Sequence, residues 1–456
     1  MNRDKLDFGN GKIKSLFRAM FFPTLVGMVF NSILNICDGM FVGHGVGSNA
    51  LAAINIVAPL FLICTGIGLT FGIGASVIGG IRLAEDNVKA ARIIMTQAYI
   101  AGAVIFGIVI LISLLFTRPV LYALGCSEAL EQYATDYLLW LLPGLVFFYL
   151  QCAGMMLIRL DGSPRYAMAV QIVAAVLNIF LDWYMVFPMA MGIKGASIAT
   201  SISCIVAGLM VLCYFIFFSE KLKFYRLRLT AKSLRLSLRN VGYMAKIGLA
   251  TFIAELAIGV TMVTGNFTFL EYLGEAGVAA YSVGCYLFPL IFSISNAVAQ
   301  SSQPIISYNY GAGNMDRVRQ ALHVAIITAC VCGIVISAGM WIGSPALAGI
   351  FLDSSEPAYA LAQQGLPLLG VCAVFFAMNI TFIGYYQSCE QATRSICYML
   401  LRGVVFVVPG FFILPSLIGV PGLWLAIPVA EVFTLTVITL AFVWQRRNRI
   451  KRMVVR

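Results

Sequence analysis

Charged residues are scarce in this chain, since Asp, Glu, Lys and Arg together make up 11% of its 456 residues. A soluble domain carries about 25%. Hydrophobic residues account for 61% of the chain. They gather into stretches of about twenty residues, the length that a helix needs to cross the roughly 30 Å apolar core of a bilayer. The scarcity of charge excludes an ordinary soluble domain and predicts an all-α integral membrane protein.

Motifs of catalysis and cofactor binding are also missing. The 12 cysteines form no CxxC pair, so neither a structural disulfide nor a cysteine metal site is expected. A phosphate-binding GxxxxGK(S/T) loop is absent, which argues against ATP hydrolysis, and the apolar stretches contain no catalytic dyad that we can identify. A channel would show a filter motif or a ring of like charges, and neither is visible. We expect a non-enzymatic protein without a cofactor, driven by an ion gradient.

Twelve apolar stretches are long enough to span a bilayer. The first is too long for the core of a signal peptide and is interpreted as a span. The predicted spans lie at about 16–42, 53–81, 93–117, 133–157, 166–187, 193–218, 241–270, 278–306, 320–342, 359–386, 395–415 and 420–444.

The net charge of +11 is distributed unevenly between the two sides of these spans. If the N-terminus lies inside, only two of the 30 Lys and Arg fall on the outer side, namely Arg118 and Lys194. This asymmetry follows the positive-inside rule and predicts that both termini are cytoplasmic. A nucleic-acid partner is therefore not expected, although the same charge on a soluble protein would suggest one.

The chain reads as a duplication, because a shift of about 227 residues aligns many landmarks between its halves. Examples are Thr24 with Thr251, Gly47 with Gly274, Asn87 with Asn314, Gly192 with Gly419, and Ala199 with Ala426. Each half holds six spans. We expect two six-helix lobes related by a pseudo-two-fold axis along the membrane normal, with the substrate site between them. The predicted boundaries are an N-terminal lobe at 1–218, a basic cytoplasmic linker at 219–240 and a C-terminal lobe at 241–456.

Polar residues of three spans gather at one predicted depth. Asp38 is near the outer end of the first span, and Asp182 is near that of the fifth, with Asn178 one turn away on the same face. Ala196 and Thr200 lie in the first two turns of the sixth, so all five are about 5–11 Å below the outer edge. Oxygen ligands suit a hard cation such as Na⁺, and a carboxylate pair could equally share a proton. The alternative is a set of separate polar groups that line a water-filled vestibule.

The second half carries buried charge of a different kind. Glu255 and Glu431 fall near mid-membrane, and Arg402 is the only basic residue that we place deep in any span. Carboxylates there could attract organic cations, helped by aromatic residues such as Tyr281 and Tyr286. The alternative is structural pairing of the carboxylates, with Arg402 as one partner, and simple packing of the aromatic rings.

Four segments resemble the multidrug and toxic compound extrusion (MATE) family. They are residues 37–43 (Cys-Asp-Gly-Met-Phe-Val-Gly), 47–53, 178–182 and 192–200. With the twelve spans and the duplication, the resemblance covers nearly the whole chain. Within the family, Arg402, the 419–426 segment and Glu431 look like the MepA-like bacterial branch.

The resemblance implies roles for individual residues. Pro23 matches a proline at which the first span of that family bends. Asp38, Asn178, Asp182 and Thr200, with the backbone carbonyl of Ala196, match the family's N-lobe cation site. Glu255 matches an acidic residue that another branch pairs with an aspartate in the tenth span. The region around Asn379 offers no such carboxylate, so a second sodium site is not expected.

The resemblance also implies an activity. H⁺ or Na⁺ would enter as a small cationic, amphipathic compound leaves, with an inward-negative potential favouring cation entry. The protein would be a multi-pass monomer in the lipid of a bacterial inner (cell) membrane. A related branch flips lipid-linked sugars, and a flippase for a lipid-linked oligosaccharide or peptidoglycan precursor is the alternative function. Such proteins usually line their cavity with several Arg or Lys, whereas this sequence offers only Arg402.

Overall fold

The structure is a computed structural model, and it describes residues 6–128, 130–227 and 230–454. These described residues form helices and no strands. They fall into two compact units. The first comprises the described parts of Met1–Leu256, Gln300–Ala321 and Gln387–Ala392, and the second those of Ala257–Ala299, Leu322–Tyr386 and Thr393–Arg456. Compactness is a different property from sequence repetition, so the lobe boundaries at 1–218 and 241–456 remain predictions.

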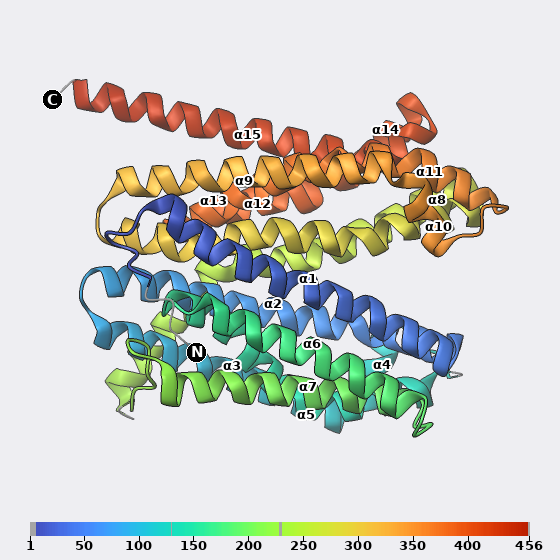
Figure 1. Ribbon diagram of the computed structural model, residues 1–456, viewed down its shortest axis with the longest axis horizontal. Helices are drawn as coiled ribbons and strands as arrows, with labels where there is room; N and C mark the ends of the chain where they lie inside the picture. The colour runs from blue at the N-terminus through green and yellow to red at the C-terminus, as the bar shows by residue number, and fades with distance from the viewer. Residues whose placement is uncertain (1–5, 129, 228–229, 455–456) are drawn as a thin grey trace. The chain divides into compact units, whose positions relative to one another are not determined.

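The first unit contains the helices of the first half of the chain. They are α1 (Ile13–Gly45), α2 (Ser48–Ala84), α3 (Val88–Leu115), α4 (Thr117–Ala123), α5 (Glu131–Leu160), α6 (Pro164–Val186), α7 (Ile193–Cys213) and the π-helix η1 (Tyr214–Phe218). Helix α1 packs on α6, and α5 packs on both α2 and α7 (Figure 1). The short helix α4 was not predicted from the sequence.

Small residues allow the helices of the first unit to approach closely. A Cβ atom on Gly72 of α2 would lie 2.8 Å from Cα of Ala153 in α5. A Cβ on Gly208 of α7 would lie 2.7 Å from the carbonyl oxygen of Phe147, also in α5. Because lipid gives helices no hydrophobic reason to associate, such close backbone packing is the usual stabilising contact between membrane helices.

Helix α8 (Ala231–Gly311) is shared by the two units. Its helical geometry is interrupted at Gly274, where φ is 64° and ψ is −158°, so α8 is two helices joined at a sharp corner. The described residues contain 11 segments long and apolar enough to cross a membrane, and α8 counts as one of them. Dividing α8 at Gly274 gives the twelve spans predicted from the sequence.

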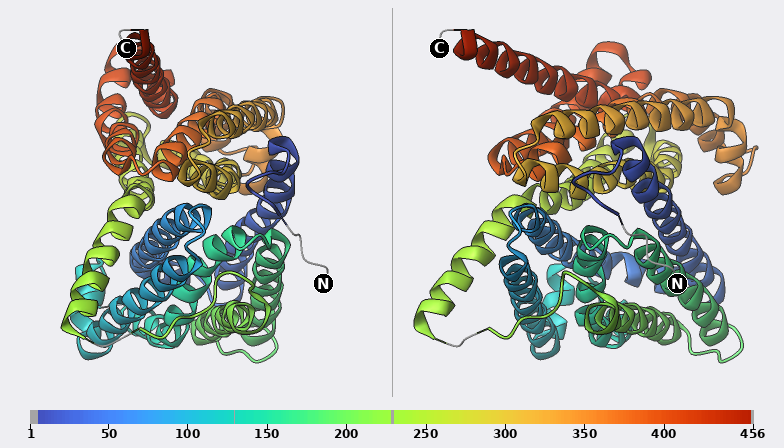
Figure 2. Two further views of the ribbon diagram at one scale, coloured as in Figure 1. Left: turned by 90° about the vertical axis from the view of Figure 1, so that its left-hand side faces the viewer. Right: turned by 60° about the vertical axis from the view of Figure 1, so that its left-hand side comes forward.

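The remaining helices belong wholly or mainly to the second unit. They are α9 (Met315–Ile342), α10 (Ser344–Phe351), α11 (Pro357–Gly370), α12 (Cys372–Ser388), α13 (Ala392–Leu400), η2 (Leu401–Val405), α14 (Val407–Ile418) and α15 (Val420–Val454). Figure 2 shows α15 as one long helix that leads to the C-terminus. Three predicted spans are subdivided: 193–218 ends in the π-helix η1, 359–386 breaks between α11 and α12, and 395–415 contains the π-helix η2.

Matching backbone features in the two halves confirm the duplication. Residues separated by the predicted shift share left-handed φ values or the same helix-capping role. The left-handed pairs are Gly47 (109°) with Gly274 (64°), Asp86 (55°) with Gly313 (73°), and Gly192 (61°) with Gly419 (68°). Asn87 and Asn314 each accept a hydrogen bond from the backbone N–H three residues later, at 3.1 and 3.2 Å. Such turns and caps begin a helix at the same point in each copy.

The start of α1 is held by residues of the second half, within the first unit. Arg317 donates from Nη2 to the carbonyl oxygens of Phe8 and Gly11, at 3.0 and 2.7 Å. Asn309 donates to the same Phe8 oxygen at 3.0 Å. These bonds anchor the segment just before α1 to the end of α8 and the beginning of α9.

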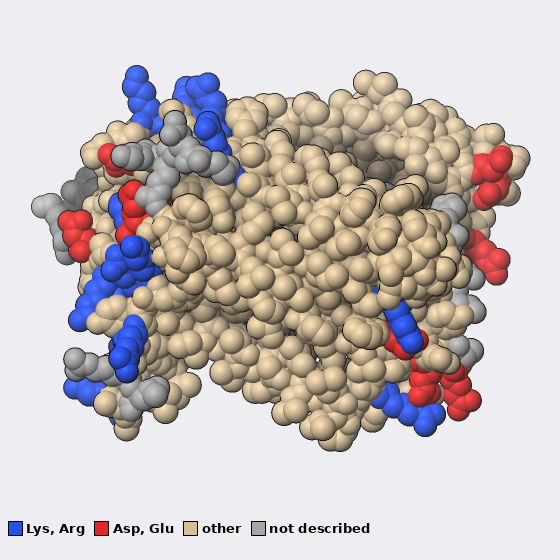
Figure 3. Space-filling view, turned by 60° about the horizontal axis from the view of Figure 1, so that its bottom comes forward, with Lys and Arg blue, Asp and Glu red and all other residues tan. Residues whose placement is uncertain are grey.

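Charged side chains lie at the helix ends on the face shown in Figure 3, which looks onto α3, α5, α6 and α7. The surface between the ends is free of visible charge. At one end of these helices Arg118 pairs with Glu131 (3.1 Å) and Lys194 pairs with Asp136 (3.4 Å). These are the two basic residues that the sequence assigned to the outer side.

Candidate functional site

An acidic cluster occupies the contacts between α1, α6 and α7. Asp182 is fully buried and Asn178 is 2% exposed, whereas Asp38 is half-buried. Asn178 donates from Nδ2 to the Thr200 hydroxyl at 3.5 Å, and that hydroxyl donates to the Ala196 carbonyl at 3.1 Å. The structure therefore links three of the five residues that the sequence predicted to share one depth.

The other two, Asp38 and Asp182, lie within interaction range of each other. Oδ1 of Asp38 and both carboxyl oxygens of Asp182 are buried, and none has a hydrogen-bond partner among the described residues. Two facing carboxylates repel each other and lose hydration on burial, so the arrangement favours uptake of a proton or a cation. An amide and a hydroxyl complete a set of oxygen ligands of the kind that Na⁺ accepts.

Sequence reasoning missed two further members of this cluster. Tyr137 of α5 and Cys37 of α1 lie within electrostatic range of both Asp38 and Asp182. The Tyr137 carbonyl accepts a hydrogen bond from Ser197 of α7 at 2.5 Å, which ties this part of α5 to the helix that carries Thr200. Among the described residues, no group of three or more His, Cys, Asp and Glu could hold a metal ion.

Helix α1 remains continuous past Pro23, which lies inside it and is half-buried. A Cβ on Gly27 would overlap Oε1 of Gln171, so α1 and α6 touch there. Neither this Gln171 oxygen nor the buried Thr24 hydroxyl has a hydrogen-bond partner within the described part of the chain. Bending at Pro23 remains a prediction.

The second unit contains a buried ion pair. Arg402 donates from Nε to Oε1 of Glu431 at 2.7 Å, and the two side chains are 7% and 2% exposed. Asn379 donates from Nδ2 to Oε2 of Glu431 at 2.7 Å and to its backbone carbonyl at 2.9 Å. The guanidinium lies 3.9 Å from the centre of the Phe376 ring. Glu431 thus has a full set of partners, which favours the structural role for Glu431 and Arg402.

Glu255 has a different environment, although it too is only 5% exposed. Its carboxyl group forms no hydrogen bond or ion pair with any residue that the structure describes. Cys152 of α5 lies within electrostatic range of it. Of the two acidic residues predicted for the substrate cavity, only Glu431 has a protein partner for its carboxyl group among the described residues.

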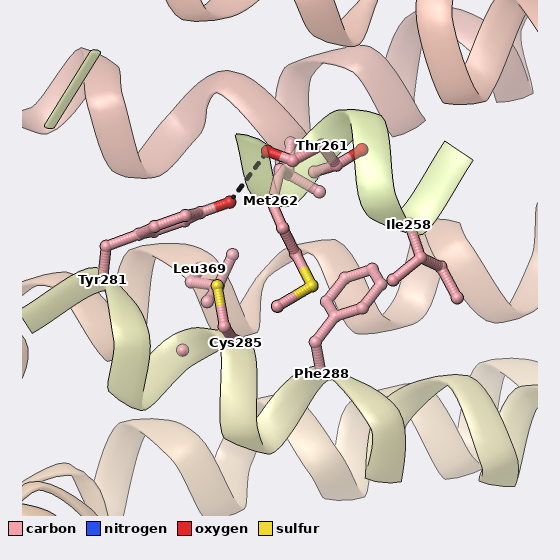
Figure 4. A pocket seen from close by; sticks show the side chains of 9 residues that line it. Ile258, Thr261, Met262, Tyr281, Cys285, Phe288 and Leu369 are labelled. Atoms are coloured by element: carbon pink, nitrogen blue, oxygen red, sulfur yellow. Dashed lines mark hydrogen bonds between the residues drawn. The ribbon is translucent and has the colours of Figure 1, made fainter. Parts of the chain in front are cut away.

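The aromatic residues predicted for this cavity lie in separate places. Tyr281 borders a small apolar pocket between the two arms of α8, α11 and α15, and its hydroxyl donates to the Thr261 carbonyl at 3.2 Å (Figure 4). Its ring stacks on Phe269 with centroids 4.5 Å apart. Tyr286 does not border this pocket, since it is 56% exposed and stacks on Phe351 of α10.

A second buried guanidinium was not predicted from the sequence. Arg159 lies in the last turn of α5, at the end of its span, and is 1% exposed. The predicted span ended at residue 157. The apolar residues Leu157, Ile158 and Leu160 continue past that point, and this continuation is the signal that could have placed Arg159 inside the protein.

Comparison with known proteins gives matches over most of the chain. A family model described as MatE matches residues 23–184 and 250–413, one stretch in each half. The chain is 25% identical over 425 residues to the multidrug export protein MepA of Staphylococcus saprophyticus, with 91% of each protein covered. It is 24% identical over 422 residues to MepA of Staphylococcus aureus strain MRSA252, again with 91% of each covered.

Solved structures share the fold. One is a multidrug resistance MATE family transporter of the MOP superfamily in an outward-facing conformation, with a TM-score of 0.89 and 21% identity over 100% of both chains. Another is a MOP superfamily transporter from Pyrococcus furiosus, described as having a binding pocket of reversed polarity that suggests a different function. Its TM-score is 0.86 at 22% identity, with 97% of each chain covered. These likenesses confirm the expected helical, two-lobed membrane fold.

Proposed function

Because the chain belongs to the MatE family, we propose that it is a secondary active exporter of lipophilic organic cations, driven by the entry of H⁺ or Na⁺. As a member of this family it is a multi-pass membrane transporter and not an enzyme. The MepA relatives are named multidrug export proteins, which supports the proposed range of substrates. The bacterial sources of these relatives support a place in the cell membrane.

One observation carries the coupling half of this proposal, namely the pair Asp38 and Asp182 with its unpartnered, buried oxygens. An ionisable group in a span marks an ion path more often than a structural contact, since its burial is expensive without a partner. Asn178 and Thr200 add neutral oxygens beside the pair. Binding of one cation or one proton neutralises the repulsion and so changes the stability of the conformation that holds the pair together.

Glu255 supports the substrate half of the proposal. Its buried carboxyl group lacks a protein cation among the described residues, whereas Glu431 has Arg402. A lipophilic cation would supply the missing positive charge. An anionic lipid-linked substrate would meet no such complement at Glu255.

Purified protein in liposomes tests the coupling. A cationic dye is loaded, and its transport is followed under a single imposed gradient, either of pH or of Na⁺. We expect transport under a pH gradient without Na⁺, and loss of that transport in Asp38→Asn and Asp182→Asn. Asp353→Asn, which changes an exposed loop carboxylate, is the control and should transport normally. Transport under a Na⁺ gradient with no pH gradient would replace H⁺ by Na⁺, and dye transport by both Asp variants would overturn the assignment.

We propose that both termini and the 219–240 linker are cytoplasmic, as the distribution of Lys and Arg predicts. A single cysteine at Ser354 should react with an impermeant maleimide added to intact cells. A single cysteine at Thr230 should react only after the cells are opened. The reverse pattern would invert the orientation.

A further inference from the structure

The Arg159 side chain is buried without a neutralising charge. Its Nη1 donates to Oε1 of Gln300 at 2.6 Å, and the same nitrogen lies 3.6 Å from Sδ of Met156. Its Nε is buried and has no hydrogen-bond partner among the described residues. Within the described part of the chain, Arg159 forms no ion pair with a carboxylate. Arg402, by contrast, lies 2.7 Å from Glu431.

Burial of Arg159 in this state is unfavourable electrostatically. Removing an ion from water is expensive even when an opposite charge compensates it. The carbonyl groups at the end of α5 give some compensation, because the C-terminus of a helix carries partial negative charge. A neutral amide gives less than a carboxylate would. The conformation that buries Arg159 must therefore be held together by other contacts, and any conformation that returns water to Arg159 gains hydration energy.

Those other contacts form a polar seam between α8 and the helices α2 and α5. On the α8 side, Gln300, Gln303 and Ser307 are all 6% exposed or less. Gln303 donates to the carbonyl oxygen of Ile73 in α2 at 3.3 Å. A seam of amides and hydroxyls can separate into water at lower cost than a seam of Leu and Ile, because water replaces its hydrogen bonds.

Close backbone contacts place both arms of α8 against α2 in this seam. A Cβ on Gly74 would overlap the Met244 carbonyl oxygen, in the first arm. A Cβ on Gly80 would lie 2.6 Å from the Ser307 hydroxyl, in the second arm. Helices α2 and α5 come from the first half of the duplication and α8 from the second. The seam is thus a contact between the halves, at the end where α5 stops and the basic linker begins.

We propose that this seam is the gate at the linker end of the transporter. The unneutralised charge of Arg159 raises the free energy of the closed gate and so favours its reopening. The proposal rests on the transport function proposed above. The hydrogen bond to Gln300 compensates part of the electrostatic cost of burying Arg159, so the gate can close and can also reopen. Arg159 and Gln300 are positioning residues, since they set the balance between closed and open gate without touching the substrate.

The unneutralised charge of Arg159 predicts opposite effects on gate stability when each partner of its hydrogen bond with Gln300 is replaced. Arg159→Met removes the buried charge and keeps the bulk, so the closed gate becomes more stable. Gln300→Met leaves the charge without its acceptor, so the closed gate becomes less stable. Gln300→Glu neutralises the charge and locks the gate. An ordinary stabilising hydrogen bond predicts instead that Arg159→Met and Gln300→Met both loosen the gate.

The test measures how fast a buried cysteine reacts, without any substrate. The 12 native cysteines are replaced by alanine, and Ser307→Cys reports on the seam. The rate of reaction with a water-soluble maleimide gives the open fraction. We expect Gln300→Met to raise this rate about tenfold and Gln300→Glu to lower it about tenfold. A hydrogen bond to a charged group contributes at least about 1.4 kcal/mol, which corresponds to a tenfold change in the open fraction. Arg159→Met should lower the rate, and adding Gln300→Met to it should have little further effect.

A second reporter separates gate opening from general loosening. Ser76→Cys lies in the α2–α5 contact, where Ser76 donates to the Met156 carbonyl at 3.4 Å, inside one half of the duplication. Its reaction rate should be the same in all variants. The proposal is overturned if Arg159→Met accelerates Ser307→Cys, or if the variants shift both reporters in parallel. Since no substrate is present, correct signs here with no dye transport would reject the proposed export while the gate stands.

Discussion

The two halves of the chain each bury a carboxylate cluster, and the two clusters differ in how their charge is balanced. In the first half, Asp38 and Asp182 face each other, and neither has a basic partner among the described residues. In the second half, Glu431 has Arg402 on one oxygen and Asn379 on the other.

The difference separates a site that must bind something from a site that is complete. A buried carboxylate with a guanidinium and an amide donor has satisfied its charge and its hydrogen bonds, and it stabilises one arrangement of helices. A carboxylate pair without a donor is satisfied only when a proton or a cation arrives. This difference is why we propose that coupling belongs to the first half, while the second half supplies Glu255 as its only buried acidic side chain without a described partner.

Neutralising the unbalanced pair should have the largest effect on transport. Asp182→Asn removes the repulsion and the exchangeable charge, so active export should fall by about a hundredfold or more. The initial rate of dye efflux, normalised to protein in the membrane, measures this. The thermal unfolding temperature should stay the same or rise, because a buried charge has been removed. Normal efflux with Asp182→Asn would place the coupling elsewhere.

Breaking the balanced pair should affect stability more than transport chemistry. Arg402→Met leaves Glu431 buried and uncompensated, which should destabilise the protein by about 3–5 kcal/mol. Combining it with Glu431→Leu should restore most of that loss, because no charge then remains. Thermal unfolding in detergent compares the two variants. A double variant no more stable than Arg402→Met would mean that the pair does more than balance charge.

Glu255 sharpens the comparison from the substrate side. Glu255→Gln should weaken binding of a monocationic dye about tenfold, equal to 1.4 kcal/mol. A neutral analogue of the same shape should bind nearly as well as before. Fluorescence titration of both dyes measures the ratio. Equal weakening for both dyes would assign Glu255 a structural role.

The smallest effect is expected at Tyr281. Tyr281→Phe removes one hydrogen bond to the Thr261 carbonyl and keeps the stacked ring. The loss of stability should be about 1 kcal/mol, and dye binding should not change if the ring is part of the packing. A clear change in dye affinity would return Tyr281 to the substrate cavity.

Sequence reasoning located the acidic cluster because depth follows directly from helix geometry. Counting residues from the predicted ends of three spans was enough to bring Asp38, Asp182 and Thr200 to one level. It could not show that Arg402 contacts Glu431, because the rotation of one helix about its axis relative to another is set by tertiary packing. For the same reason Tyr281 and Tyr286 were grouped together, although they point into different surroundings.

The helix breaks and the buried Arg159 were harder to predict. The interruption between α11 and α12 and the π-helix η2 occur within continuous apolar stretches, where hydropathy gives no signal. A basic residue at the end of a span usually lies at the membrane surface, so the sequence gives little reason to expect that Arg159 is buried. Its burial depends on Gln300, which is 141 residues away in the chain. The duplication, in contrast, was readable because its turns require Gly or Asn at fixed positions.

Helix α1 is fixed at its start and carries an acidic group near its other end. The backbone at Gly11 is held by Arg317, and the Asp38 carboxyl group lies near the far end of the helix. The arm between them is about 40 Å long at 1.5 Å per residue, so each degree of tilt moves the carboxyl group by roughly 0.7 Å. Hydrogen-bond distances vary by only about 0.5 Å, so a shift of that size would break or form contacts of the carboxyl group. Weakening of the hydrogen bond between Arg317 and Gly11 would therefore make the position of the Asp38 carboxyl group less well defined, although that group lies at the opposite end of the helix.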